Sequence, residues 1–128
     1  MHHTNAQEQT IPLMKTKFGW VEIGNIRYDH DVIVHKDKSV EKRSKKKSKK
    51  LKNLYGHTPL ADHELAFLKK EKPEVVYIGT GQYGDLPVTE EAKKILAKYE
   101  TVIQPTPEVL ELMEKEHRPY VALLHVTC

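Results

Sequence analysis

Residues 75–81 are Val-Val-Tyr-Ile-Gly-Thr-Gly, an unbroken apolar run that leads into a glycine-rich loop. A strand that is apolar at every position has no face to turn toward water, which is typical of strands buried on both faces in parallel sheets. We therefore expect a strand at 75–79 in the interior of an α/β domain.

Downstream of this run the pattern predicts alternating helices and strands. Thr89 is a typical N-cap residue, and the helix expected after it has apolar residues at helical spacing: Ala92, Ile95, Leu96 and Tyr99. Strands are expected at 101–104 and 120–126. Short connections and right-handed crossovers then place the strands at 75–79, 101–104 and 120–126 in one largely parallel sheet.

Two further helices complete this half of the chain. Thr106-Pro107 predicts an N-cap with proline in the first turn, followed by a buried stripe of Val109, Leu112 and Met113. Upstream, Asp62 is expected to cap a short helix that ends before Pro73. The C-terminal half is therefore predicted to be βαβαβ.

The N-terminal half carries a different pattern. Residues 17–43 alternate strand-forming and turn-forming residues, with Gly24-Asn25 as a two-residue hairpin signal, and predict a β-meander. Residues 1–16 are expected to be a flexible leader, which leaves 17–128 as a single domain.

Composition limits the class of protein. With 128 residues the chain has room for one modest core, which excludes a two-domain cofactor enzyme. The apolar runs are far shorter than the roughly 20 residues that cross a bilayer. A single cysteine, Cys128, excludes an internal disulfide framework, and no secretory pattern precedes residue 17, so a cytoplasmic location is expected.

Several of these segments together resemble the Mth938-like domain family, also called domain of unknown function 498. The resemblance covers residues 17–128 and rests on Phe18-Gly19, on the segments 28–33 (YDHDVI) and 75–81, on Pro105-Thr106, and on 123–128 (LLHVTC). It implies a three-layer α/β fold, in which a mixed central sheet carries helices and an extra β layer formed by the meander. The family is largely without assigned activity, includes proteins associated with assembly of respiratory complex I, and supplies no established catalytic residues.

The loop after the first predicted parallel strand matches the pattern GxGxxG at 79–84. A dinucleotide site is disfavoured because Asp85 to Val88 separate the glycines from the next helix, and because no acidic residue ends the next strand. The glycines are better explained by a tight strand exit, with a small-anion site at the carboxyl edge of the sheet as the alternative. The candidate ligand-binding residues are Gly79, Thr80, Gly81, Gly84, Thr106 and His125, and no cofactor is expected.

Other polar clusters are weaker candidates. Asp29, His30, Asp31 and His35 could suit a metal, but strand alternation would place His30 on the opposite face from the others, so no metal site is predicted. His125 and Cys128 are expected to be structural rather than a nucleophilic pair.

The most unusual feature of composition is a basic run. Residues 36–52 contain ten Lys or Arg against two acids, whereas the whole chain has a net charge of +3. Such a run suits weak, salt-dependent contact with nucleic acid or an acidic partner, and it equally suits a solvated or self-neutralised surface. The candidate contact residues in the Lys-rich segment 42–52 are Lys45, Lys46, Lys47, Lys49 and Lys50.

From the sequence we expect an interaction or assembly module, non-enzymatic, with an unknown protein partner. The alternatives are a small anion- or metabolite-binding protein or enzyme that uses the carboxyl-edge loops, and weak nucleic-acid binding through the segment 42–52. The oligomeric state and the presence of any catalytic activity are left open.

Overall fold

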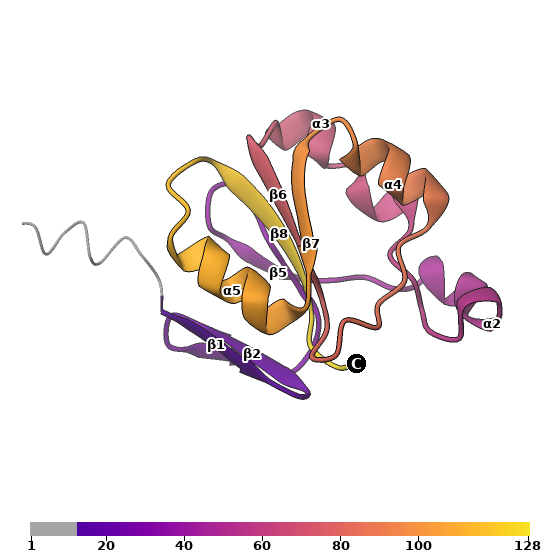
Figure 1. Cartoon of the computed structure of the whole chain (residues 1–128), viewed down its shortest axis with the longest axis horizontal. Coiled ribbons are helices and arrows are strands. Elements are labelled where there is room, and N and C mark those ends of the chain that lie inside the picture. Colours follow the sequence, from indigo (N-terminus) through magenta and orange to yellow (C-terminus); the bar gives the residue numbers. More distant parts are fainter. Residues whose placement is uncertain (1–12) are drawn as a thin grey trace, which may run out of the picture.

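The computed structural model describes residues 13–128, which form two β-sheets and a set of short helices (Figure 1). The larger sheet has the strand order β5-β4-β8-β6-β7. Its strands are β4 (Val32–Val34), β5 (Val40–Lys42), β6 (Val75–Thr80), β7 (Glu100–Gln104) and β8 (Tyr120–His125). Strand β6 pairs in parallel with β7 and β8, whereas β4 pairs antiparallel with β5 and β8. The predicted mixed sheet with three parallel strands is confirmed.

The smaller sheet is an antiparallel meander of three strands, β1 (Met14–Lys17), β2 (Trp20–Ile23) and β3 (Ile26–Tyr28). The predicted meander at 17–43 is therefore divided between two sheets. The reason is burial: all three residues of β4 are buried, and such a strand fits between two neighbours, here β5 and β8, better than at an outer layer. Strand β1 also begins at Met14, inside the expected leader 1–16, of which residues 1–12 lie outside the described part.

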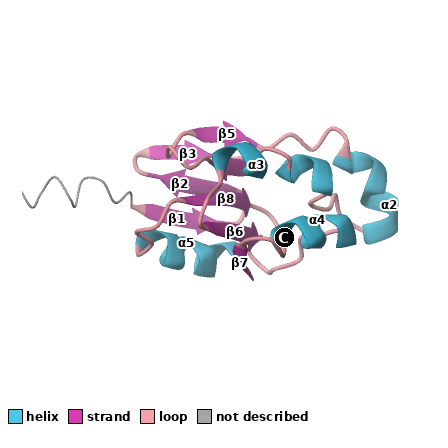
Figure 2. Ribbon diagram, turned by 90° about the horizontal axis from the view of Figure 1, so that it is seen from above, coloured by secondary structure: helices cyan, strands magenta, loops and turns pink. Residues whose placement is uncertain are grey.

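The larger sheet is the middle of three layers. On one face, helix α5 (Thr106–Glu114) packs on β6 and β7, and the smaller sheet lies beside it, as Figures 1 and 2 show. The opposite face carries η2 (Asp62–Leu65), α3 (Leu68–Glu71) and α4 (Glu90–Leu96). A hydrogen bond from the backbone amide of Met14 to Glu114 Oε2, 2.8 Å long, fastens β1 to α5.

Alternation along the central strands divides the core in two. Val75 and Tyr77 face α5 and the smaller sheet, whereas Val76 and Ile78 face η2, α3 and α4. All six residues of β6 are buried, as the sequence predicts. Each apolar residue of the strand thus contributes to one of two cores on opposite faces of one sheet.

The helix predictions are partly wrong. The single short helix expected after an Asp62 cap is instead the 3₁₀ helix η2, which includes Asp62 and has Ala61 at its N-cap position, followed by the separate helix α3. The Thr89 side chain caps α4 by accepting a hydrogen bond from Ala92 N, as expected. In α5 the predicted stripe is wrong at Leu112, which is 43% exposed, because the helix is enclosed by both sheets and buries Leu110 instead. Thr106, the predicted N-cap residue, is instead the first residue of the helix, and Pro105 occupies the N-cap position. The helix has no side-chain cap hydrogen bond.

No helix within residues 13–128 combines the length and the apolar character needed to cross a membrane.

The turn after β6 depends on a glycine. Gly81 has φ +101°, and a Cβ at this position would overlap the carbonyl carbon of Cys128. Gly24 in the β2–β3 turn also has a positive φ of +64°, but nothing lies within 4 Å of its would-be Cβ. Substitution of Gly24 therefore tests backbone strain alone, whereas substitution of Gly81 tests strain together with steric overlap.

We predict that Gly81→Ala lowers the free energy of unfolding by about 3 kcal/mol, because strain and overlap with residues 127–128 add. Gly24→Ala should cost only about 1 kcal/mol, since it meets strain alone. Chemical denaturation of both variants measures the difference. Equal losses would refute the claim that the loop after β6 is packed closely against residues 127–128.

Candidate functional site

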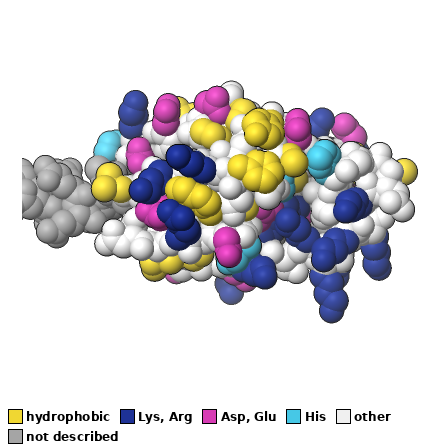
Figure 3. Space-filling model, turned by 90° about the horizontal axis from the view of Figure 1, so that it is seen from below, with side chains coloured by type: hydrophobic (Ala, Val, Ile, Leu, Met, Phe, Trp, Pro, Cys, Tyr) yellow, Lys and Arg dark blue, Asp and Glu magenta, His cyan; other side chains and the backbone are white. Residues whose placement is uncertain are grey.

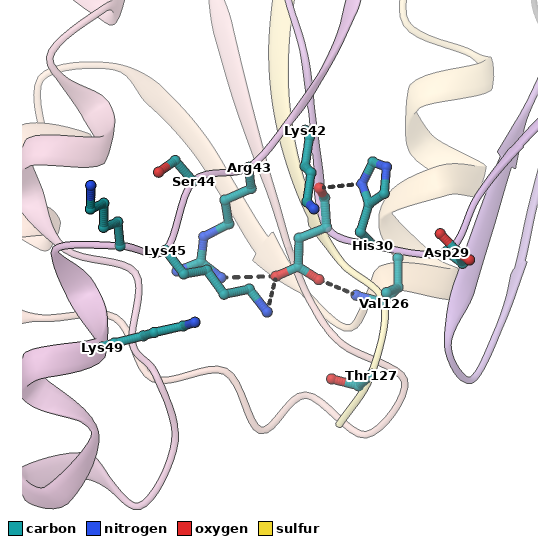
Figure 4. A pocket seen from close by; sticks show the side chains of 11 residues that line it. Asp29, His30, Lys42, Arg43, Ser44, Lys45, Lys49, Val126 and Thr127 are labelled. Carbon is teal, nitrogen blue, oxygen red and sulfur yellow. Dashed lines mark hydrogen bonds and ion pairs between the residues drawn. The ribbon is translucent and has the colours of Figure 1, made fainter.

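A cavity of about 620 Å³ lies beside the carboxyl end of β8. Three segments line it: the β3–β4 connection at 29–31, the chain after β5 at 42–49, and residues 126–127 (Figure 4). Five cationic side chains contribute to the lining: Lys42, Arg43, Lys45, Lys46 and Lys49. The acids among the lining residues are Asp29 and Asp31, so the cavity has an excess of positive charge.

The carboxylate of Asp31 is the structural centre of this region. Its Oδ2 accepts hydrogen bonds from His125 Nδ1 at 2.8 Å and from Arg43 Nη1 at 2.9 Å, and its Oδ1 accepts one from Val126 N at 2.9 Å. Lys45 Nζ lies 3.4 Å from Oδ2. Burial alone would raise the pKa of Asp31, but the hydrogen bonds from His125 and Val126 and the charge of Lys45 hold this pKa well below its usual range.

Arg43 extends this centre into the protein. Its fully buried guanidinium bridges Asp31 and Glu64, with Nε and Nη2 forming a bidentate pair with the two Glu64 oxygens, and Nη2 also donates to Pro59 O. Glu64 accepts further hydrogen bonds from Ser48 Oγ and Ala61 N. Burial alone would raise the pKa of Glu64, but Arg43, Ser48 and Ala61 N lower it. Burial alone would lower the pKa of Arg43, but Glu64 and Asp31 raise it. The buried charges are thus paired and saturated with hydrogen bonds.

The rest of the basic run does not share in this pairing. Among residues 13–128, Arg43 and Lys45 are the cations of the segment 36–52 that lie within ion-pair distance of an acid. Part of the run folds into the short helices η1 (Ser48–Leu51) and α2 (Lys52–Tyr55). Figure 3 shows Lys and Arg side chains gathered at this end of the molecule.

The glycine loop and residues 125–128 meet at one edge of the sheet, as expected, but they bond to each other. The amide of Gly81 donates to Thr106 Oγ1, whose hydroxyl donates to the carbonyl of His125. Three further loop amides are engaged: that of Gln82 with Thr127 O, and those of Tyr83 and Asp85 with Cys128 O. Gly79 packs against Thr106, and Gly84 lies near Thr80 and Pro105. These donors hold residues 125–128 in place, and helix α4 begins only at Glu90.

Asp29, His30 and Asp31 lie in the connection between β3 and β4 and not in a strand, so the side-chain alternation predicted for them is wrong. Asp31 points inward, Asp29 is exposed, and His30 Nδ1 bonds to the carbonyl of Asp31. His35 lies elsewhere, between Glu41 and Glu71. No group of three potential metal ligands occurs in the described part of the chain.

Sequence reasoning missed the ion-pair centre itself. One signal was present: Arg43 is the single arginine in a run of lysines, and its planar guanidinium suits a buried, bidentate carboxylate pair better than an ammonium does. Its partners Asp31 and Glu64 are distant in sequence, so only the fold identifies them.

Comparison with solved structures finds close likenesses. A conserved hypothetical protein from Pyrococcus horikoshii OT3, PH1505, is 32% identical with a TM-score of 0.78, and the match covers 91% of this chain and 99% of that one. The protein MT938 is 30% identical with a TM-score of 0.72 and the same coverage. A Bordetella pertussis protein described as a Mth938-like domain shares the fold at 19% identity and a TM-score of 0.54 over 91% of this chain and 86% of that one. No family sequence model and no curated protein matches the chain.

We predict that Asp31→Asn lowers the free energy of unfolding by about 3 kcal/mol, because it leaves the buried Arg43 short of negative charge. Asp29→Asn, two residues away and exposed, should change stability by less than about 0.5 kcal/mol. Denaturation of both variants near neutral pH makes the comparison.

The pH dependence has a defined sign. Since the pKa of Asp31 in the folded state lies below its unfolded value of 3.8, its contribution is present above about pH 4 and is lost as pH falls through the folded pKa. The difference in free energy of unfolding between wild type and Asp31→Asn should therefore become smaller in acid. If Asp31→Asn loses no stability at neutral pH, or loses only as much as Asp29→Asn, the central role of Asp31 is contradicted.

Proposed function

This chain belongs to the Mth938-like family, and we propose that it serves there as a binding module for small anions, with the cavity beside Asp31 as its binding site. The observation that carries the proposal is the lining: Lys42, Lys46 and Lys49 face this cavity, and the residues described offer them no acid within ion-pair distance. Phosphate or carboxylate groups are the ligands that such a lining attracts.

The buried centre supports this proposal by fixing the floor of the cavity. Asp31 is neutralised by Arg43 and Lys45, so its charge is not free to repel an anion. The hydrogen bonds to Asp31 hold the 29–31 connection, residue 43 and residue 126 in fixed positions. The walls are therefore pre-organised, while the lysine side chains on the rim stay exposed and adaptable.

Affinity for a simple anion should be modest. Ammonium groups at a solvent-exposed rim are screened, so we expect about millimolar affinity for inorganic phosphate, equivalent to roughly −4 kcal/mol. A ligand that carries several anionic groups would engage more of the lysines. A module of this kind fits the role in interaction or assembly that the sequence suggests, with the anion belonging to a metabolite or to a partner.

A second candidate function is contact with nucleic acid through the outer face of the Lys-rich segment. Its support is the cluster of exposed side chains on and before η1: Lys46, Lys47, Lys49 and Lys50. Tyr55, 39% exposed, is the aromatic ring that α2 offers nearby, so stacking contributes little and phosphate contacts dominate.

For the anion site, titration with inorganic phosphate should shift the backbone amide resonances of residues 45–49 and 126–127 in a saturable manner. The double variant Lys46→Gln/Lys49→Gln should weaken binding roughly tenfold, by about 1.4 kcal/mol. The control Lys94→Gln/Lys98→Gln removes the same charge from exposed positions on and just after α4 and should bind as wild type does. Shifts confined to residues 81–84, or equal weakening by both double variants, would refute the site.

For nucleic acid, replacement of Lys45, Lys46, Lys47, Lys49 and Lys50 by Gln should abolish binding to a generic duplex while changing stability by no more than about 1 kcal/mol. Wild-type affinity should fall steeply with salt, because counterions are released on binding. The matched variant with Lys69, Lys70, Lys93, Lys94 and Lys98 changed to Gln should retain binding. Affinity that survives both the first set of substitutions and high salt would rule out this electrostatic contact.

A further inference from the structure

We propose that Asp31, His125 and Thr127 form a hydroxyl-activating relay at the wall of the cavity, with Thr127 as a nucleophile toward esters or thioesters of carboxylic acids. This inference rests on the proposed anion site, because the preferred substrates are those whose phosphate or carboxylate group the cavity lysines would hold. Neither the sequence motifs nor the family resemblance assigns a role to Thr127.

The three side chains are joined in a line. His125 Nδ1 lies 2.8 Å from Asp31 Oδ2, and His125 Nε2 lies 3.2 Å from Thr127 Oγ1. His125 ends β8 and Thr127 follows two residues later, and the short distance between Thr127 Oγ1 and His125 Nε2 shows that the two side chains lie on the same side. A hydroxyl on an imidazole nitrogen whose other nitrogen is held by a carboxylate is the arrangement that activates nucleophiles in hydrolases.

The hydrogen bonds determine which imidazole nitrogen carries the proton. Asp31 is held ionised by Arg43, Lys45 and Val126 N–H, so it can only accept, and His125 Nδ1 must donate to it. In the neutral imidazole Nε2 then has a free lone pair, which is the group that can accept the Thr127 hydroxyl proton. Asp31 is thus the positioning residue and His125 the general base.

Thr127 also has access to a ligand. Its side chain is partly exposed and lines the cavity, and Figure 4 shows its oxygen directed into the space between Val126 and Lys49. Lys46 and Lys49 line the same cavity, where their ammonium groups would stabilise negative charge that develops on a carbonyl oxygen. The hydroxyl that His125 faces is therefore that of Thr127, and the thiol of Cys128 has no part in the relay.

The chemistry is an ester hydrolysis in two steps. Thr127 Oγ1 bonds to the acyl carbon while its proton passes to His125 Nε2, the carbonyl electron pair returns, and the bond to the alcohol or thiol leaving group breaks. The leaving group takes the proton from Nε2. Water then attacks the threonyl ester, gives its proton to Nε2, and releases the carboxylic acid as the Thr127 hydroxyl is restored. Water is the only co-reactant.

The test uses the full chain with p-nitrophenyl acetate as the probe. We expect release of p-nitrophenolate together with one acetyl group on Thr127, located by peptide mass spectrometry, and slower labelling when inorganic phosphate fills the cavity. Thr127→Val, which is nearly isosteric, should lose this label, whereas Thr127→Ser should restore it at residue 127 and Cys128→Ser should keep it. His125→Gln should lower the labelling rate on the order of 100-fold.

A second measurement is independent of turnover. In the neutral form of the His125 imidazole, nitrogen resonances should report a protonated Nδ1 and an unprotonated Nε2, and Asp31→Asn should remove this preference.

Labelling confined to lysines or Cys128 and unaffected by Thr127→Val, or a neutral wild-type imidazole with its proton on Nε2, would overturn the relay. Phosphate binding without acylation of Thr127 would refute the relay alone, whereas acylation without phosphate binding would refute the anion site.

Discussion

The buried carboxylate of Asp31 is the interaction on which the architecture of this edge depends. It ties together the residue before β4, the residue that follows β5 and the end of β8, three pieces of chain at the margin of the larger sheet. Because Arg43 also pairs with Glu64, the same network anchors η2 and the segment that leads to it. A carboxylate taken out of water is costly unless it is fully paired, so these segments are held to one geometry.

The fold was largely predictable, because its signals are local. Val75 to Ile78 are apolar at every position, and Thr89 lies directly before a helix with regular spacing, so one strand and one helix follow from neighbouring residues. The division of the meander was not predictable in this way. Strand β4 leaves its predecessors to lie between β5 and β8, and that choice depends on β8, which is far along the chain.

The candidate site was less predictable than the fold, for the same reason. The sequence of the glycine loop allows an anion site as an alternative to a tight turn, whereas in the structure the amides of Gly81, Gln82 and Tyr83 donate to Thr106, Thr127 and Cys128. The cavity lies where the basic run comes close to the 29–31 connection, and the residue spacing within either segment does not predict that they meet. Residue types were informative, whereas their partners required the tertiary structure.

The central place of β8 has a consequence for how the molecule is made. Strand β4 pairs with β5 on one edge and with β8 (residues 120–125) on the other, and β6 pairs with β8 on the edge opposite β7. Both strands therefore lack one neighbour until residues 120–125 have been synthesised. During synthesis β4 therefore leaves the ribosome before its second neighbour exists, and the larger sheet is complete only once β8 lies between β4 and β6. Completion of the sheet depends on pairings between segments that are distant in sequence, which slow folding. Until β8 pairs with β4 and β6, their unpaired edges are open to aggregation.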